Sequence, residues 1–405
     1  MELSFPLILD GATGTELQKR GFSGGECAEH WTLEHPEAIL EIQRGYVAAG
    51  SQVLYTPTFG ANRTKLEAHG LFNQVGVYNR RLAALSKEAA GEWALVAGDL
   101  APTGLFLYPL GDTSFEELVD IYTEQAAALE EAGVDLFVVE TMMTLAEARA
   151  AVLAVKSVSD KPVFVSFTCD ENGRTLSGSD VTALLQIMQG MGIDAFGLNC
   201  SVGPADMVRQ LARLREYARV PLIAKPNAGV PEISDGKTVY RCSPVDFTAQ
   251  LDEMAAAGVC IFGGCCGTSA EHILALREKV PGLSLCAPDP QHTQFLPLAT
   301  EKAAFFLPPD ISPGAALPIT PELEDLLEDA LETDDALLTL ALQSPDELED
   351  FAACQYLITK PLCLRCDDAW LLEQALRLYQ GRAMYDGVLS EDALAPLSQK
   401  YGLVY

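Results

Sequence analysis

Short apolar runs alternate with longer amphipathic stretches over residues 1–285 of the chain. Short runs bounded by turn residues are typical of strands in a buried parallel sheet, and the longer stretches have the spacing of helices. The eight predicted strands are Leu7–Asp10, Gln52–Thr56, Leu95–Asp99, Leu136–Glu140, Val163–Phe167, Ala195–Asn199, Leu222–Lys225 and Val259–Phe262. The predicted helices between them include Phe115–Ala132, Leu145–Val158, Val181–Met191, Met207–Tyr217, Pro244–Ala257 and Ala270–Lys279.

This alternation predicts an α/β fold, a (β/α)8 TIM barrel that occupies residues 1–286. An open doubly wound sheet is the main rival, but it would more usually stop near five or six strands. The polar and glycine-rich motifs favour the barrel because each follows a predicted strand. They are DGATG, TPTFG, GDLAPTG, ETM, SFT, LNCS, KPNAG and GGCCG, in chain order. In a TIM barrel these positions form the catalytic face.

The pattern changes after the eighth strand. Residues 287–320 contain recurring prolines and are interpreted as a linker. Residues 321–405 are predicted to form a small acidic α/β appendage. Its first part, from Thr320 to Asp350, has twelve acidic and no basic residues and suggests amphipathic helices with a solvated face. The remainder has the pattern of a βαβ fragment: a strand over Tyr356–Leu364, a helix over Ala369–Tyr379, a turn, a second helix and the strand-like Tyr401–Tyr405.

Composition narrows the classes of partner. A formal charge of −30 argues against a nucleic-acid partner, because phosphate contacts need clustered Lys and Arg. No apolar run approaches the length of a membrane span, so no membrane partner is expected. The first strand begins a few residues after Met1, which leaves no room for a signal peptide and favours a cytoplasmic location. Eleven cysteines are an odd number, and reduced thiols are favoured over a disulfide framework.

Three of these cysteines, Cys200, Cys265 and Cys266, follow strands six and eight. Successive strand residues point to opposite faces, so Cys265 and Cys266 reach one ion only if the backbone leaves the pleat, which the flanking glycines permit. Three thiolates at strand ends suit a zinc ion with an open fourth position, as in catalytic sites. The alternatives are packed small residues or a strained vicinal disulfide.

A zinc ion with three thiolate ligands activates water poorly but can hold a substrate thiol as a thiolate near neutral pH. The thiolate, not the thiol, is the nucleophile. The predicted chemistry is therefore attack of a metal-held thiolate on an electrophilic carbon. The other cysteines are interpreted as packed or incidental, including the pair Cys363 and Cys366 on the appendage.

Seven motifs together carry a resemblance to a known family: DGATGTEL, TPTFGANRTKL, APTGLFLYPLG, ETMMTLAEARAA, LNCSVGP, PNAG and GGCCGT. They resemble the homocysteine S-methyltransferase family, and most of all the homocysteine-binding barrel that opens cobalamin-dependent methionine synthases. The resemblance implies zinc held by Cys200, Cys265 and Cys266, with the homocysteine sulfur as fourth ligand and acceptor of a methyl group, so that methionine forms.

The resemblance also implies substrate contacts. Asp10, with the backbone at Gly11 and Ala12, and Glu140 match acidic residues that hold the amino group of homocysteine. Thr56 and Phe59 match pocket residues at the end of the second strand. An ammonium group attracts carboxylates, and the N–H groups of a glycine-rich turn suit a carboxylate. The alternatives are a turn or helix cap for Asp10 and a barrel ion pair for Glu140. For Asn199 and Asn227, direct contact with the substrate and a turn-forming or supporting role are both open.

The methyl donor is left open by the sequence. Residues 360–405 resemble part of a methyltetrahydrofolate-binding barrel, but LRCD and MYDG replace expected Asp and Asn positions, which disfavours folate binding. No DxHxxG cobalamin motif is present. We expect the methyl donor to be external, with methylcobalamin on a separate protein as the first candidate. The partner would then be a corrinoid or folate-binding methyl-donor protein. S-methylmethionine or a betaine-type compound is the alternative donor. A non-catalytic zinc-binding subunit, and a thiol or selenol acceptor other than homocysteine, are further alternatives.

Overall fold

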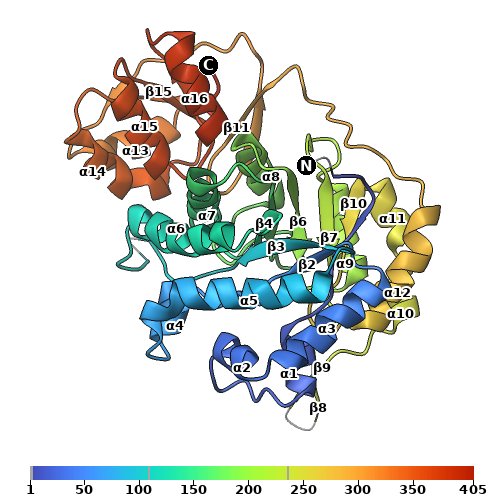
Figure 1. Cartoon of the computed structure of the whole chain (residues 1–405). Coiled ribbons are helices and arrows are strands. Elements are labelled where there is room, and N and C mark those ends of the chain that lie inside the picture. Colours follow the sequence, from blue (N-terminus) through green and yellow to red (C-terminus); the bar gives the residue numbers. More distant parts are fainter. Residues whose placement is uncertain (1–2, 108–109, 235–236) are drawn as a thin grey trace.

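The computed structural model describes residues 3–107, 110–234 and 237–405. Residues 108–109, inside the APTGLFLYPLG motif, therefore lie outside the described part of the chain. Eight strands form the central sheet (Figure 1): β1 Leu7–Ile8, β2 Val53–Tyr55, β3 Leu95–Leu100, β4 Leu136–Met142, β5 Val163–Phe167, β6 Ala195–Asn199, β7 Leu222–Lys225 and β10 Val259–Phe262.

The eight strands are parallel and follow the order β1-β10-β7-β6-β5-β4-β3-β2. An isolated parallel bridge between Leu9 and Val53 joins the two ends of this order. The sheet is thereby closed on itself, and the predicted (β/α)8 TIM barrel is confirmed. Closure leaves the outer two strands with no free edge.

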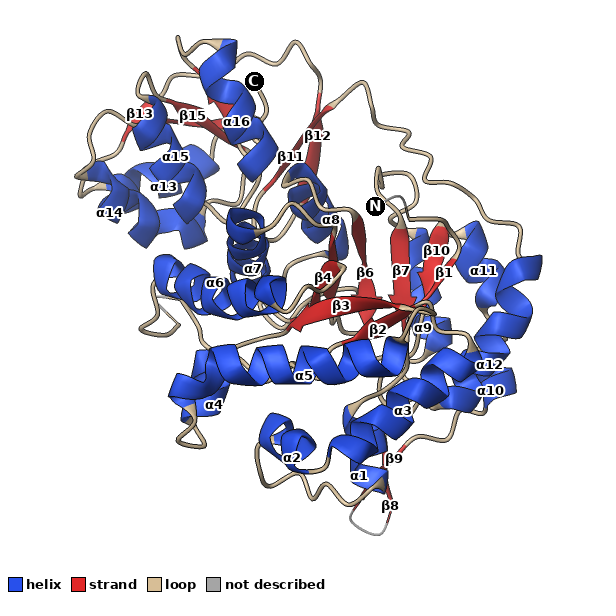
Figure 2. Cartoon of the chain, viewed as in Figure 1, coloured by secondary structure: helices blue, strands red, loops and turns tan. Residues whose placement is uncertain are grey.

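Helices cover the outside of the barrel, and each strand is followed by at least one of them (Figure 2). Their bounds are α1 Gly14–Lys19, α2 Ala28–Glu34, α3 Pro36–Ala49, α4 Arg63–Glu67, α5 Val75–Ala90, α6 Phe115–Glu131, α7 Leu145–Val158, α8 Val181–Gly190, α9 Pro204–Ala212, α10 Pro244–Phe247, α11 Leu251–Ala256 and α12 Ala270–Lys279. Ser114, Thr144 and Asp180 cap α6, α7 and α8 by accepting hydrogen bonds from backbone N–H groups of the first turn.

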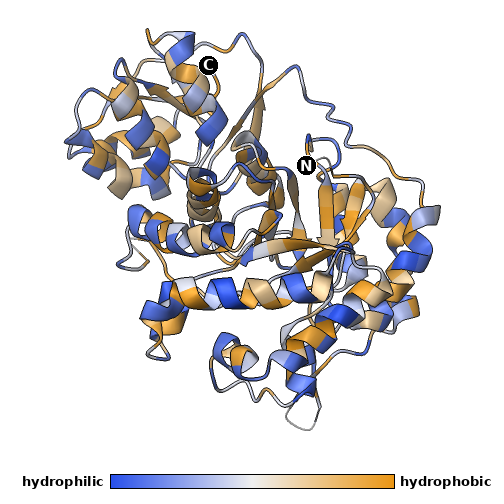
Figure 3. Cartoon of the chain, in the orientation of Figure 1, coloured by the Kyte–Doolittle hydropathy of each residue, from blue (hydrophilic) through white to orange (hydrophobic). Residues whose placement is uncertain are grey.

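Apolar side chains from the strands fill the barrel interior. They form a buried cluster that includes Leu9, Tyr55, Ala97, Val138 and Ile261. Figure 3 shows the strands mainly in hydrophobic colours and the outer helices with alternating hydrophilic stretches, as expected for helices that pack one face inward. The apolar core therefore fills the barrel interior, and polar side chains such as Asp10 and Lys225 follow at the carboxyl ends of the strands.

Two predicted helices differ from the observed ones. α9 begins at Pro204, where proline at the first turn needs no N–H partner, and ends at Ala212. The predicted helix over Pro244–Ala257 is divided into α10 and α11. An additional hairpin, β8 Glu232–Ser234 with β9 Lys237–Val239, lies between β7 and α10.

Residues 287–320 contain more regular structure than a linker. β11 Leu296–Ala299 and β12 Ala304–Leu307 form an antiparallel hairpin, and β13 Leu317–Pro318 begins the appendage sheet. The sequence pattern did not indicate this hairpin because its strands are only four residues long and β11 contains Pro297.

The appendage contains a parallel sheet with the order β13-β14-β15-β16. Its remaining elements are α13 Leu323–Leu331, β14 Leu338–Ala341, α14 Glu347–Cys354, β15 Leu362–Arg365, α15 Ala369–Leu378, β16 Met384–Asp386 and α16 Glu391–Tyr401. It lies beside α6, α7 and α8 of the barrel (Figure 1). None of the helices in the described ranges combines the length and the apolar character that a membrane span requires.

Candidate functional site

Cys200, Cys265 and Cys266 lie together at the carboxyl ends of β6 and β10. Their three sulfur atoms are all within 4.8 Å of one another. The Sγ atoms of Cys200 and Cys266 are 4.0 Å apart. Sulfur ligands about 2.3 Å from one tetrahedral zinc ion would be separated by roughly the same distance. The three thiols therefore suit a zinc ion without rearrangement of the chain.

The backbone leaves regular strand geometry to bring the cysteines together. Cys200 and Ser201 have positive φ angles of 62° and 55°, a conformation that is uncommon outside glycine and concentrates at functional sites. The N–H of Cys200 donates to the carbonyl of Lys225, and the N–H of Cys265 donates to that of Pro226. Hydrogen bonds to the strand between them thus hold both cysteine loops.

The three thiols influence one another's ionisation. Hydrogen bonds from Cys265 and Cys266 lower the pKa of the Cys200 thiol to about 3. Hydrogen bonding with Cys200 in turn raises the pKa of Cys265 and of Cys266. The protons of the three thiols are therefore shared within one hydrogen-bonded group. A dication would displace them, since metal ligands must be deprotonated.

A cavity of about 530 Å³ opens at this end of the barrel. Its wall includes all three cysteines together with Asp10, Asp99, Glu140 and Lys225. The predicted contacts Gly11, Ala12, Thr56 and Phe59 also line it. The structure therefore brings every residue of the predicted site to one cavity.

Asp10 is buried and both of its oxygens have partners. Oδ2 accepts a hydrogen bond from the N–H of Tyr55 at 2.8 Å, and Oδ1 lies 3.1 Å from the Nζ of Lys225. The same Nζ lies 3.8 Å from an oxygen of Glu140 and 3.5 Å from the centre of the Tyr55 ring. Desolvation alone would lower the pKa of Lys225, but Asp10, Tyr55 and Glu140 raise it, so the ammonium stays charged.

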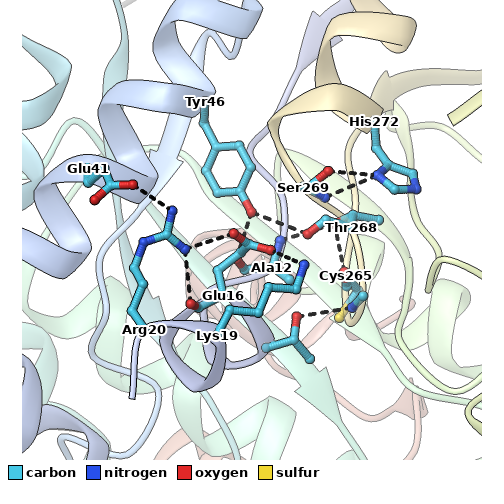
Figure 4. A network of polar contacts seen from close by, with 12 residues as sticks. Ala12, Glu16, Lys19, Arg20, Glu41, Tyr46, Cys265, Thr268, Ser269 and His272 are labelled. Atoms are coloured by element: carbon cyan, nitrogen blue, oxygen red, sulfur yellow. Dashed lines mark hydrogen bonds and ion pairs between the residues drawn. The ribbon is translucent and has the colours of Figure 1, made fainter. Parts of the chain in front are cut away.

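The loop at Gly11 and Ala12 is fastened to the cysteine loop through Thr268 (Figure 4). The N–H of Ala12 donates to Oγ1 of Thr268, whose hydroxyl donates to the carbonyl of Cys265. The hydroxyl of Tyr46 donates to the carbonyl of Ala12 at 2.7 Å. The Tyr46 ring also lies so close that a Cβ on Gly11 would be 2.8 Å from it. The Ala12 amide thus already has a partner, and its backbone is rigidly placed.

Thr56 and Phe59 occupy different parts of the cavity. The buried hydroxyl of Thr56 accepts a hydrogen bond from the N–H of Asp99 and contacts the hydroxyl of Thr58. The Phe59 side chain is 43% exposed and forms part of the outer wall. Asn199 supports the site: its amide lies 3.8 Å from the sulfur of Cys265 and donates to the hydroxyl of Thr141.

Sequence reasoning missed Lys225 and Asp99. Lys225 ends β7 and Asp99 is the penultimate residue of β3, and both are 3% exposed. A charged residue at the last position of a predicted buried strand was the available signal, because such a group needs a partner inside the protein.

The cysteines of the CxxC pair lie elsewhere. Cys363 and Cys366 are buried in the appendage, and the three-thiol group described above is the metal-binding candidate found among the described residues. His272, which sequence reasoning did not assign to a site, packs beside the cysteine loop as part of a helix cap.

Comparison with known proteins agrees with this geometry. A family profile described as homocysteine S-methyltransferase matches residues 7–280. Two curated relatives named methionine synthase are each 32% identical, one from Mycobacterium leprae over 300 residues and one from Mycobacterium tuberculosis over 297 residues. The matches cover 69% and 68% of this chain but only 24% and 25% of these relatives.

Solved structures show the same barrel. The homocysteine methyltransferase MmuM from Escherichia coli in its oxidized form is 25% identical, with a TM-score of 0.57 over 67% of this chain and 95% of that one. Its metallated form, 24% identical over 67% of this chain and 96% of that one with a TM-score of 0.56, supports the fold.

Proposed function

Because the chain belongs to the homocysteine S-methyltransferase family, we propose that it is a methyltransferase that forms methionine from homocysteine at a zinc ion. Cys200, Cys265 and Cys266 would hold the ion, and the sulfur of homocysteine would take the fourth position. The cavity beside the cysteines would receive the amino-acid part of the substrate.

The observation that carries this proposal is the shared cavity. Three sulfur atoms within 4.8 Å of one another open into the same space as several carboxyl groups, among them those of Asp10 and Glu140. The first group suits a metal that binds a thiol, and the second suits an ammonium group. A molecule with a thiol at one end and an ammonium group at the other fits both requirements.

When bound, zinc would supply the charge that keeps a substrate thiol deprotonated near neutral pH. The residues of the chain do the rest. The loops of Cys200 and Cys265 are held by hydrogen bonds to β7, so the sulfur position is fixed before the substrate arrives. In the transfer, the substrate sulfur forms a bond to the methyl carbon while the bond from that carbon to the donor breaks and leaves its electron pair on the donor.

We propose methylcobalamin on a corrinoid protein as the donor. The methionine synthase relatives support this choice, and the sequence itself contains no DxHxxG motif for a corrinoid. S-methylmethionine or a betaine-type compound is the second candidate, supported by the likeness to the homocysteine methyltransferase of Escherichia coli. Either donor would approach the sulfur through the outer part of the cavity.

The metal assignment is tested with Cys266→Ala. Loss of one of three ligands is expected to remove most of the bound zinc and to reduce turnover by at least roughly a hundredfold, since even groups that only support a ligand contribute up to that amount. Metal analysis by mass spectrometry and a methionine assay measure these effects. Cys363→Ala, which removes a buried thiol of the appendage, is the matched control and should alter neither. Equal zinc content in the Cys266 variant and the wild type would refute the assignment.

The donor is tested by supplying zinc-loaded protein and homocysteine with each candidate in turn. Methionine from methylcobalamin supports the proposed donor, and methionine from S-methylmethionine or betaine alone supports the second. If no donor yields methionine, a non-catalytic zinc subunit is favoured. Competition with other thiols tests the identity of the acceptor.

A further inference from the structure

β4 departs from regular pairing where it carries Glu140. Its pairing with β5 is regular up to Val139 and resumes at Met142, with one residue more on β4 than on β5 over this stretch. Such a β-bulge leaves a backbone group unpaired and turns a side chain in a new direction, and bulges are frequent next to active sites. The bulge comprises Glu140 and Thr141, and both line the cavity. The direction of the Glu140 carboxyl group therefore depends on what holds the bulge.

Thr141 has a strained backbone conformation. Its φ angle is 57°, which a β-branched residue rarely adopts. Among the residues that the structure describes, the other non-glycine residues with a positive φ are Cys200 and Ser201, which follow β6. Conformations of this kind persist only where the surrounding structure holds them. A partner must therefore stabilise the turn at Thr141.

That partner is the side chain of Asn199, the last residue of β6, which is 1% exposed. Its Oδ1 accepts a hydrogen bond from the N–H of Thr141 at 2.9 Å, and its Nδ2 donates to Oγ1 of Thr141 at 2.7 Å. Oδ1 also accepts from the hydroxyl of Ser166 at 2.9 Å, on the strand between β4 and β6. One amide thus holds the bulge across an intervening strand.

The same amide reaches the cysteines. Its Nδ2 donates to the sulfur of Cys265 over 3.8 Å, and Asn199 directly precedes Cys200 in the chain. An amide nitrogen carries two hydrogens, so one can go to Thr141 and the other to Cys265. Groups that hydrogen-bond to a metal ligand orient it and change how strongly it donates charge to the metal. Asn199 therefore joins the bulge of β4 to the three-thiol group.

Glu140 has little else to hold its direction. Its Oε2 is without a hydrogen-bond partner in the described part of the chain, and Nζ of Lys225 is 3.8 Å from it. Glu140, Thr141 and Cys265 line the cavity, whereas Asn199 is buried behind them. The influence of Asn199 on a ligand must therefore pass through these neighbours.

We propose that Asn199 is a positioning residue that fixes the direction of Glu140 through Thr141 and at the same time donates to the sulfur of Cys265. The two ends of the cavity, one with the carboxyl groups and one with the sulfur atoms, are thereby placed by a single buried amide. The inference rests on the proposed function, since it assumes that a thiol amino acid spans both ends. The role of Asn199 requires no contact with the substrate.

A double-mutant cycle tests the link to Glu140. Binding of L-homocysteine to the zinc-loaded full chain is measured by titration calorimetry. In the wild type, Glu140→Gln is expected to weaken binding roughly ten- to a hundredfold, the usual worth of a hydrogen bond to a charged group. After Asn199→Ala, the same substitution should weaken binding less than about threefold, because the carboxyl group is no longer aimed at the ligand and the two sites are not additive.

The control for the cycle is Asn73→Ala, which removes an exposed amide between α4 and α5. In this background Glu140→Gln should weaken binding as much as it does in the wild type. Asn199→Val, which suits a strand and fills more of the space, is a second variant and should reproduce the result of Asn199→Ala.

A spectroscopic readout tests the contact with Cys265. With cobalt(II) in place of zinc, the charge-transfer absorption from thiolate to metal should shift to longer wavelength in both Asn199 variants. The reason is that a sulfur atom that has lost a hydrogen bond donates charge more readily. Asn73→Ala should leave the absorption unshifted.

The outcomes are distinguishable. An undiminished effect of Glu140→Gln after Asn199→Ala would overturn the proposal, and so would an unshifted cobalt spectrum. Loss of zinc binding by both Asn199 variants would also overturn it, because it would indicate a general structural role. If the wild type bound no homocysteine, or if Glu140→Gln did not weaken binding, the proposed function would be wrong about this cavity, and the inference would fall with it.

Discussion

His272 is held as a neutral imidazole by the groups around it. Its Nδ1 lies 3.2 Å from the N–H of Ser269 and accepts from it, so the hydrogen of the ring must be on Nε2, which donates to the carbonyl of Cys242 at 3.0 Å. The contact between Ser269 and His272 completes the N-terminal cap of α12 (Figure 4). Burial lowers the pKa of His272 from its usual 6.5. Protonation would place a second N–H against that of Ser269.

The stability of the protein should therefore decrease as the medium becomes acidic. The contribution of His272 is complete above pH 6.5, the pKa of the unfolded chain, and is lost as the pH falls through the lower pKa of the folded state. The loss should be about 1 kcal/mol, the usual worth of a helix cap. His272→Gln keeps an acceptor at this position but does not titrate. Urea unfolding at pH 7.5 and 5.5 should thus show a larger decrease for the wild type, and equal decreases would contradict this account.

At the residue scale, the motifs predicted that the three cysteines and Asp10 belong to the site. They did not predict that Asp10 pairs with Lys225. These two residues are 215 positions apart, and they meet only because β10 lies between β1 and β7. Lys225 ends a buried strand, where pattern analysis indicates burial and gives no partner. The pairing is a property of barrel closure, and a local pattern contains no information about it.

Gly197 determines how closely β6 and β7 approach. A Cβ at this position would lie 2.1 Å from the carbonyl oxygen of Ile223, which is backbone and cannot turn aside. The strand that carries Cys200 thus depends on the absence of a side chain two residues before its end.

Gly197→Ala should destabilise the fold by at least about 1–3 kcal/mol, the usual cost of overpacking. Gly282→Ala is the control because nothing lies within 4 Å of its Cβ position, and it should change stability by less than about 0.5 kcal/mol. Denaturant unfolding measures both. Similar stabilities for the two variants would show that β6 and β7 separate without cost.

At the scale of elements, pattern analysis succeeded where an element is long or fully buried. The predicted bounds of β5, β6, β7, β10, α7 and α12 equal the observed ones. It failed for β14, where the four residues LTLA lie between acidic segments that suggested only helices. β14 is stabilised by pairing with β13 and β15, and short strands of this kind depend on distant partners.

The appendage and the barrel share one hydrophobic core. Buried residues of both belong to the same contiguous cluster. Arg149 of α7 lies in this junction with 1% exposure and donates to the carbonyls of Leu376 and Arg377 and to the side chain of Gln380. An ion pair between Arg377 and Glu116 at 2.6 Å adds a contact to α6.

Arg149→Met should loosen the appendage while the barrel stays folded. Methionine keeps the apolar stem but leaves buried acceptors without donors, at a cost of about 1–3 kcal/mol each. Hydrogen exchange should become faster for backbone amides of β14, β15 and β16, with little change in β4 and β5. Arg81→Met, at an exposed arginine of α5, is the control. Undiminished protection in the appendage would show that Arg149 does not hold it in place.

The barrel wall also sets a fixed length. The sulfur atoms follow β6 and β10, whereas the carboxyl groups of Asp10 and Glu140 stand at the end of β1 and on β4. A closed eight-stranded sheet has a width given by its strand number and stagger, and its diameter does not adapt to what enters. If the metal held by the sulfur atoms and the carboxyl groups bind the two ends of one molecule, the barrel fixes the distance between those ends. An amino acid one methylene shorter would reach the metal or the carboxyl groups but not both, so the fixed width of the barrel would select the substrate by its length.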